Sequence, residues 1–249
     1  MLVVGELEKC RLYIESHKKE KEINYRKLPV RPCITISRET GTNAKLVSEK
    51  LIKILQERSK ENEPGWTIFD KNLIEKVLED HNLPGTLRRL LHEDKVSFFS
   101  SMLNEMLSGL PGHWTLIHKT GETILQIASL GNVIIIGRGA NIITQNLSNA
   151  LHVRLIAPLN ERVKNFAEVH MLDYKKAKAL VEEHDINRMK YIHSVFNKKI
   201  DDPSLYHLIV NTRGLTCLQT ANIIGSAVVG KFPDIFEKEK RFFSQLADY

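Results

Sequence analysis

Short apolar runs alternate with longer segments of helical periodicity along most of the chain. Five runs of four to six residues are rich in apolar, mostly β-branched side chains, which is typical of strands in a buried parallel sheet. The segments between them repeat apolar residues every three or four positions, the spacing of an amphipathic helix. The predicted strands are Cys33–Ile36, Trp66–Phe69, Asn132–Ile136, Leu151–Ile156 and Leu205–Val210.

Strands and helices that alternate in this way predict an α/β fold, with a five-stranded parallel sheet and helices on both faces. Ligands of such sheets bind at the carboxyl ends of the strands. We therefore expect the polar residues that follow the strands to lie along one edge of the fold. These residues are Arg38–Lys45, Asp70, Arg138, Arg162 and the turn at Asn211–Thr212.

The first predicted strand leads through a polar turn directly into a helix. Residues 40–43 are turn-forming, and both Gly41 and Asn43 adopt positive φ at little cost. A helix that begins in such a loop presents main-chain N–H groups and a partial positive charge, which favours phosphate. The loop does not match the motif G-x-x-x-x-G-K-[ST], so an ordinary strand–turn–helix of an α/β protein remains the alternative for this stretch.

Composition narrows the class of protein. Of the 249 residues, 42% are hydrophobic and 27% are charged, as in ordinary globular proteins. The three cysteines are scattered and form no C-x-x-C, which predicts a reducing cytoplasm and excludes a disulfide framework. We find no apolar run long enough to span a membrane and no signal peptide. The net charge of +6 suits nucleotides, nucleic acids and membrane surfaces alike.

Several charged residues are candidates for phosphate chemistry. Phosphoryl transfer requires positioning and positive charge around the phosphate oxygens. Arg138 lies between two glycines after a buried strand, where a guanidinium can grip a phosphate; an ordinary surface arginine is the alternative. Arg162 and Arg188, taken alone, are typical of solvated helix surfaces. Three roles are open for Asp70: it could orient an acceptor, hold a Mg²⁺-bound water or cap a helix. The sequence contains no histidine metal motif and no G-x-S-x-G.

Four segments and one residue pair, taken in this order, resemble the cytidylate kinase-like family, within the nucleoside monophosphate kinases of the P-loop fold. The pair Asp185-x-x-Arg188 matches the lid of that family. The resemblance covers about residues 30 to 230. The segments are Ile34–Gly41, Phe69–Ile74, Ile136–Asn141 and Leu205–Thr212.

The resemblance implies a role for each candidate. Asp70 and Arg138 would bind the acceptor nucleotide, and Arg162 and Arg188 would be lid arginines that close over the transferring group. Lys45 would act with these arginines in catalysis. ATP and Mg²⁺ would be the cofactors. The loop that binds ATP would consist of Arg38, Gly41, Thr42, Asn43, Ala44, Lys45 and Leu46.

The loop departs from the family pattern. Asn43 replaces a loop glycine, and Gly139 stands where cytidylate kinases carry an aspartate. The hydroxyl that binds Mg²⁺ is missing unless Ser48 or Thr42 supplies one. Lys45 lies one residue late but can still reach the phosphates. In place of the phosphate lysine and the following Gly-Ser/Thr stand Ala44, Lys45 and Leu46.

The resemblance also implies the domain organisation. A helical extension, residues 1–29, would precede a P-loop kinase-like domain at residues 30–230. That domain would carry an acceptor-side helical insertion at about residues 80–130 and a lid at about residues 158–200. A helical tail would follow at residues 231–249.

The predicted function is ATP-dependent phosphorylation of a nucleoside monophosphate, with CMP or dCMP first, in the cytoplasm. The partners would be a nucleoside triphosphate and a nucleoside monophosphate. The alternative is an inactive nucleotide-binding or sensor protein of the same fold, which Ala44 and Leu46 favour. A nucleic-acid-binding function ranks last, because the basic residues are spread out and no aromatic stacking platform is visible.

Overall fold

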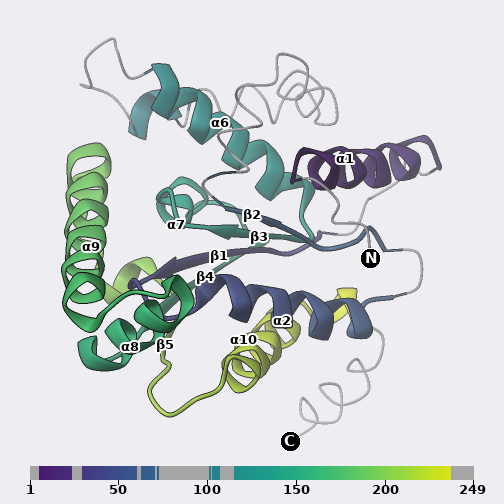
Figure 1. Ribbon diagram of the computed structural model, residues 1–249. Helices are drawn as coiled ribbons and strands as arrows, with labels where there is room; N and C mark the ends of the chain where they lie inside the picture. The colour runs from purple at the N-terminus through teal and green to yellow at the C-terminus, as the bar shows by residue number, and fades with distance from the viewer. Residues whose placement is uncertain are drawn as a thin grey trace, which may run out of the picture.

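The computed structural model describes residues 6–23, 30–60, 63–70, 72, 101, 103–106 and 115–236. All five strands are parallel and lie in the order β2-β3-β1-β4-β5, so the first strand is central (Figure 1). The predicted five-stranded parallel sheet with helices on both faces is thereby confirmed. The strands are β1 (Cys33–Arg38), β2 (Thr67–Phe69), β3 (Val133–Ile136), β4 (Ala150–Ile156) and β5 (Leu208–Asn211).

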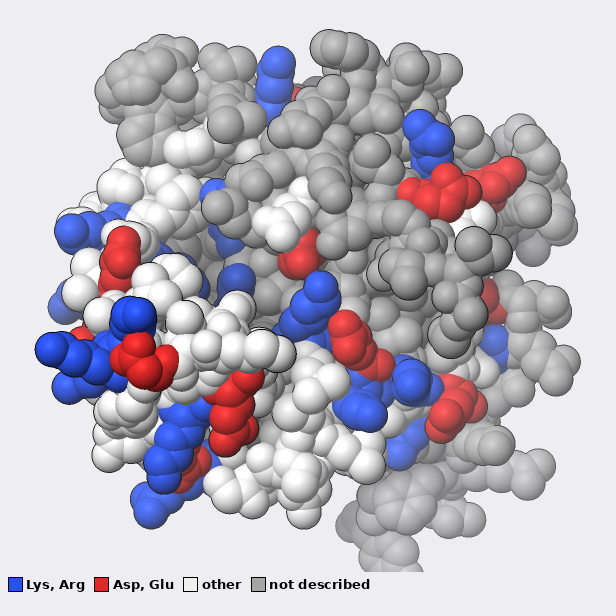
Figure 2. Space-filling view, in the orientation of Figure 1, with Lys and Arg blue, Asp and Glu red and all other residues white. Residues whose placement is uncertain are grey.

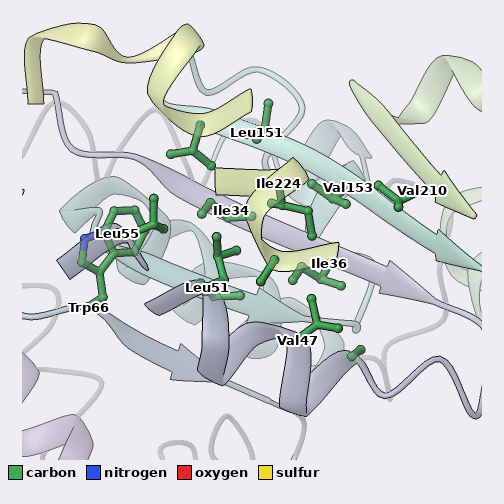
Figure 3. Close-up of a cluster of buried hydrophobic side chains, with 14 of the residues drawn as sticks. Ile34, Ile36, Val47, Leu51, Leu55, Trp66, Leu151, Val153, Val210 and Ile224 are labelled. Carbon is green, nitrogen blue, oxygen red and sulfur yellow. The ribbon is translucent and has the colours of Figure 1, made fainter. Parts of the chain in front are cut away.

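Helices α2 (Ala44–Arg58) and α10 (Cys217–Lys231) pack together over one face of the sheet (Figures 1 and 3). Ile34 and Ile36 of β1 lie under Leu51 of α2 and Ile224 of α10, and all four side chains are almost fully buried. Burying one such side chain contributes about 1.5–3 kcal/mol. This packing fixes where β1 ends and where α2 begins.

Helices α1 (Glu6–Ile23), α6 (Thr115–Leu130) and α7 (Ala140–Ile143) cover the opposite face (Figure 1). Tyr13 of α1 packs edge-on against Phe69, with the ring centroids 5.4 Å apart. Its buried hydroxyl donates to the carbonyl oxygen of Gly131 at 2.6 Å. The predicted N-terminal helix therefore forms and packs on the sheet domain.

Two helices, α8 (Leu159–His170) and α9 (Tyr174–Phe196), follow β4, and we call them the lid. Val163, Ala177 and Val181 join them in a small apolar cluster. Asp173 caps α9, because its side chain accepts a hydrogen bond from the Lys176 N–H at 2.9 Å. The lid lies beside the end of the sheet at which β1 stops (Figure 1).

The fifth strand begins three residues later than predicted. Pro203–Leu205 forms the 3-10 turn η2, and Asp202 caps it by accepting from the Ser204 N–H at 2.9 Å. Pairing with β4 therefore starts only at Leu208. A capping box formed by Thr216 and Gln219 opens α10.

Some predictions concern residues that the structure does not describe. Most of the acceptor-side insertion, about residues 80–114, lies outside the described residues, and so does the tail beyond Phe236. Ile235 and Phe236 themselves pack into the apolar cluster under α2 and α10. Among the described helices, none is both long and apolar enough to cross a membrane.

Candidate active site

The loop between β1 and α2, residues 39–43, which we call the phosphate loop, has the shape that its sequence predicts. Gly41 has φ +87° and Asn43 has φ +54°, so both adopt the left-handed conformation. Asn43 is the N-cap of α2, but its side chain forms no capping hydrogen bond, and the first turn of α2 contains no acidic residue. The amino end of α2 therefore retains the positive potential that favours an anion.

Arg162 of the lid is buried and joins the lid to the phosphate loop. Its Nη1 donates to the Thr40 carbonyl oxygen at 3.1 Å, and its Nε donates to the Ala157 carbonyl oxygen at 2.9 Å. The carboxylate of Glu39 lies 3.2 Å from the same Nε. From the next turn of α8, Asn165 Nδ2 donates to the Gly41 carbonyl oxygen at 3.1 Å. Helix α8 is thus docked on the loop through two main-chain oxygens and the Glu39 carboxylate.

Asp185 and Arg188, one turn apart on α9, meet the loop at Thr40. Asp185 Oδ1 accepts from the Thr40 N–H at 2.9 Å and from Thr40 Oγ1 at 2.8 Å. Arg188 Nη2 contacts both Asp185 Oδ1 and Thr40 Oγ1. Burial raises the pKa of Asp185, but the hydrogen bonds from Thr40 and Arg188 outweigh it, so the pKa lies below its ordinary value. Asp185 is therefore held as a carboxylate.

Arg38 ends β1 and lies near charged groups from several elements. Burial is the main cause that lowers its pKa to about 10. The guanidinium groups of Arg188 and Arg138 lower this pKa further, which places both of them close by. The carboxylates of Asp70 and Asp185 oppose the shift. The Arg38 guanidinium therefore lies within electrostatic reach of two other arginines and two carboxylates at the carboxyl edge of the sheet.

Arg138 has an unusual main-chain conformation. It has φ +58° and lies between Gly137 at φ +85° and Gly139 at φ +68°. A Cβ on Gly137 would overlap the Arg38 guanidinium, and one on Gly139 would overlap the ring of Phe196. A non-glycine residue in this region costs about 1–2 kcal/mol, so the surrounding packing holds Arg138 in place.

The other residues predicted for the loop and the start of α2 differ in exposure and contacts. The Ala44 side chain packs into the core under α2, and Leu46 is exposed. Lys45 is exposed on the first turn of α2. Thr42 is buried, and its Oγ1 donates to the Glu39 carbonyl oxygen at 2.9 Å.

Residues 33–214 match a family model described as the cytidylate kinase-like family. The chain belongs to the cytidylate kinase-like family. A cytidylate kinase of Methanocaldococcus jannaschii is 24% identical over 166 residues, which are 66% of this chain and 91% of that protein. A cytidylate kinase of Pyrococcus horikoshii is 26% identical over 149 residues, which are 59% of this chain and 74% of that one.

A solved structure shares the fold. An uncharacterized protein from Eubacterium ventriosum aligns with a TM-score of 0.61 over 80% of this chain and 99% of that chain, at 18% identity. At this identity the likeness shows the fold alone. The chemistry of this family member therefore has to be argued from its own residues.

The hydroxyls of Ser48 and Thr42, the two candidates for a magnesium ligand beside the loop, are both engaged in hydrogen bonds. Ser48 is fully buried, and its Oγ donates to the Ala44 carbonyl oxygen at 2.8 Å. The Thr42 hydroxyl likewise donates to a main-chain carbonyl oxygen, so each of the two hydroxyls already forms a hydrogen bond within the chain. In the described ranges, no group of three or more His, Cys, Asp or Glu side chains could hold a metal ion. We therefore treat Mg²⁺ as part of the ATP substrate and derive no step through it.

Sequence reasoning placed Glu39 and Thr40 in the polar loop but gave them no partners in the lid, and it missed Asn165. It also missed Arg154 of β4, which is buried, donates to Ser37 Oγ at 3.1 Å and lies 5.6 Å from the centre of the Tyr206 ring. An arginine inside a mostly apolar strand was the signal that could have found Arg154. No local pattern marks the other three, because their partners lie more than 100 residues away.

Proposed function

We propose that this protein transfers the γ-phosphoryl group of ATP to a nucleoside monophosphate, with CMP or dCMP as the favoured acceptor. Membership of the cytidylate kinase-like family supports a nucleotide kinase. The observation that carries the proposal is that Arg162 and Arg188 of the lid contact Thr40 of the phosphate loop, while Arg38 at the end of β1 lies within electrostatic reach of Arg138 and Arg188. Such a concentration of guanidinium groups suits phosphates and the charge that develops between them.

Each group has a role in this proposal. The phosphate loop and Lys45 hold the triphosphate of ATP, which arrives as its magnesium complex. Arg138 and Asp70 position the acceptor phosphate and nucleotide. Arg162 and Arg188 stabilise the transferring group from the lid, and the docked lid excludes water as a competing acceptor. In-line positioning and positive charge then supply most of the catalysis.

A second candidate function is nucleotide binding without catalysis. The specific observation that favours it is the loss of the phosphate lysine, because Ala44 places a methyl group in the core at that position. The engaged hydroxyls of Thr42 and Ser48 add to this argument. Such a protein would bind ATP and transfer nothing.

Nucleic-acid binding stays in third place. On the face shown in Figure 2, the described Lys and Arg side chains are interspersed with Asp and Glu rather than gathered in one patch. A duplex or single strand requires a continuous basic surface. We propose instead that the partners are nucleotides and that the protein acts in the cytoplasm, where its three free cysteines stay reduced.

The test is ATP-dependent phosphorylation of CMP, dCMP, UMP, AMP and GMP, followed as acceptor-dependent ADP formation, with Arg138→Ala as the control. The proposal expects turnover of at least one acceptor, with CMP or dCMP fastest, and its loss in Arg138→Ala. ATP binding without turnover of any acceptor would favour the second candidate function.

A further inference from the structure

The carboxylate of Asp185 occupies a position that is built for an anion. Four donors converge on it: the Thr40 N–H at 2.9 Å, Thr40 Oγ1 at 2.8 Å, Arg162 Nη1 at 2.6 Å and Arg188 Nη2 at 2.5 Å. Two of the donors come from the phosphate loop, and two are guanidinium groups of the lid. Both oxygens of the carboxylate are used, because Arg162 binds Oδ2 and the other three donors bind Oδ1.

These donors are of the kind that binds phosphoryl oxygens. Main-chain N–H groups of a strand–loop–helix turn, hydroxyls and arginines form short charge-assisted hydrogen bonds to phosphate. The Asp185 carboxylate raises the pKa of Arg38 against the larger effect of burial, so the Arg38 guanidinium also lies within electrostatic reach of this position. The position therefore has the chemistry of a phosphate site that holds a side chain.

We propose that Asp185 is an internal ligand of the phosphate loop, whose carboxylate holds the position that a phosphoryl group of the bound triphosphate takes. The inference rests on the proposed function of this loop. It makes Thr40 an anion-binding residue, through its N–H and its hydroxyl, and Asp185 a residue that determines specificity. A triphosphate gains contacts along the whole loop and displaces Asp185, whereas a single phosphate gains too few to do so.

Displacement leaves the donors in place for the ligand. Arg162 lies on α8 and is held by Glu39 and the Ala157 carbonyl oxygen independently of Asp185. Arg188 lies one turn beyond Asp185 on α9 and keeps its reach to Thr40. An incoming phosphoryl group therefore replaces one carboxylate among donors that are already oriented, which is the advantage of preorganisation.

The test is equilibrium binding of magnesium-free tripolyphosphate and of inorganic phosphate to wild type and variants. Asp185→Ala removes the internal ligand, and Asp185→Asn keeps its size but removes its charge. Glu183→Ala is the matched control, because Glu183 is exposed on the same helix two residues away and its removal changes the net charge equally. Thr40→Val removes the loop hydroxyl while keeping the shape of the side chain.

We expect Asp185→Ala and Asp185→Asn to bind tripolyphosphate at least about tenfold more tightly than wild type, and Glu183→Ala to stay within about twofold. Thr40→Val in the Asp185→Asn background should lose part of the gain. Equal or weaker binding in both Asp185 variants, while wild type binds tripolyphosphate and ATP, overturns the inference and leaves the proposed function standing. If neither the wild type nor any variant binds tripolyphosphate or ATP, the proposed function itself fails.

Discussion

Gly41 of the phosphate loop lies directly against the main chain of Arg162 on α8. A Cβ atom on Gly41 would overlap the Arg162 carbonyl oxygen, and the φ of +87° would strain any side chain. The Gly41 carbonyl oxygen also accepts from Asn165, so the lid contacts this residue from two sides. Loop and lid fit together because position 41 carries no side chain.

Gly41→Ala should therefore lower both the stability of the protein and its affinity for ATP. We expect the free energy of unfolding, measured with urea, to fall by more than about 2 kcal/mol, because left-handed strain adds to the overlap with a main chain that cannot move freely. ATP affinity should fall as well.

Gly214→Ala is the matched control for this change. Gly214 also has positive φ, +69°, but a Cβ there would meet open space. Its replacement should cost only the strain of about 1–2 kcal/mol. If both variants lose the same stability and both keep the ATP affinity of wild type, the contact between Gly41 and Arg162 contributes neither to stability nor to ATP binding.

The sheet could be predicted because each strand carries its own signal. The apolar run at Val133–Ile136 and the polar turn after Arg38 mark a buried strand and a strand–loop–helix unit without reference to distant residues. Helix caps also carry a local signal, because Asp173 directly precedes α9 and bonds to the first turn of that helix. The start of β5 could not be predicted in this way, because Pro203 forms a turn whose apolar neighbours resemble a strand.

The union of loop and lid could not be predicted, for a different reason. Glu39 and Arg162 are 123 positions apart, and their contact depends on the angle at which α8 leaves β4. The same holds for Thr40 and Asp185. The family resemblance assigned Arg162 and Arg188 to a lid, but it gave neither of them a partner. Contacts between segments far apart in the chain produce no repeating sequence pattern from which a partner could be predicted.

Lys45 offers a test of the altered phosphate loop. It is exposed on the first turn of α2, next to the loop that lacks its lysine at position 44. If Lys45 supplies the missing charge, Lys45→Ala should weaken ATP binding at least about tenfold in calorimetry. Lys53→Ala removes the same charge from an exposed position two turns further along α2 and should change affinity less than about twofold. Equal effects of the two changes would exclude a specific role for Lys45.

Arg138 should act on the acceptor rather than on ATP. A charge-assisted hydrogen bond contributes about 1.5–3 kcal/mol, so Arg138→Ala should weaken CMP binding by about ten- to a hundredfold while ATP affinity stays near that of wild type. Arg138→Lys should recover part of the loss, because the charge remains and the bidentate geometry does not. Separate titrations with CMP and ATP measure both. Unchanged CMP affinity in Arg138→Ala would remove Arg138 from the acceptor site.

Two buried histidines predict that stability depends on pH. Burial, with some contribution from His207 and Lys231, lowers the pKa of His152 to about 3, and burial lowers the pKa of His17 to about 4. In the unfolded chain a histidine has a pKa of about 6.5. Below about pH 6.5 the unfolded chain therefore binds more protons than the folded protein. The stability that the two neutral, buried histidines allow is fully present above about pH 6.5, and the free energy of unfolding falls as the pH drops toward 4 and 3. Each histidine adds a slope of up to about 1.4 kcal/mol per pH unit.

His152→Gln tests this dependence. Glutamine does not titrate and can still form a hydrogen bond with Thr35, whose hydroxyl lies 2.8 Å from His152 Nδ1. The free energy of unfolding should then fall less steeply between pH 6.5 and pH 4 than in wild type. His193→Gln, at an exposed position on α9, should keep the slope of the wild type. An unchanged slope in His152→Gln would contradict the burial of a neutral histidine.

The most direct measurement is ³¹P nuclear magnetic resonance of the wild-type protein with MgATP and CMP. The account predicts that the resonances of CDP and ADP grow together, one acceptor phosphorylated for each ATP consumed, and that Arg188→Ala and Arg138→Ala slow this growth at least about a hundredfold. Bound ATP that persists unchanged beside CMP, and beside dCMP in a second sample, would contradict the account and identify a protein that binds nucleotides without phosphoryl transfer to them.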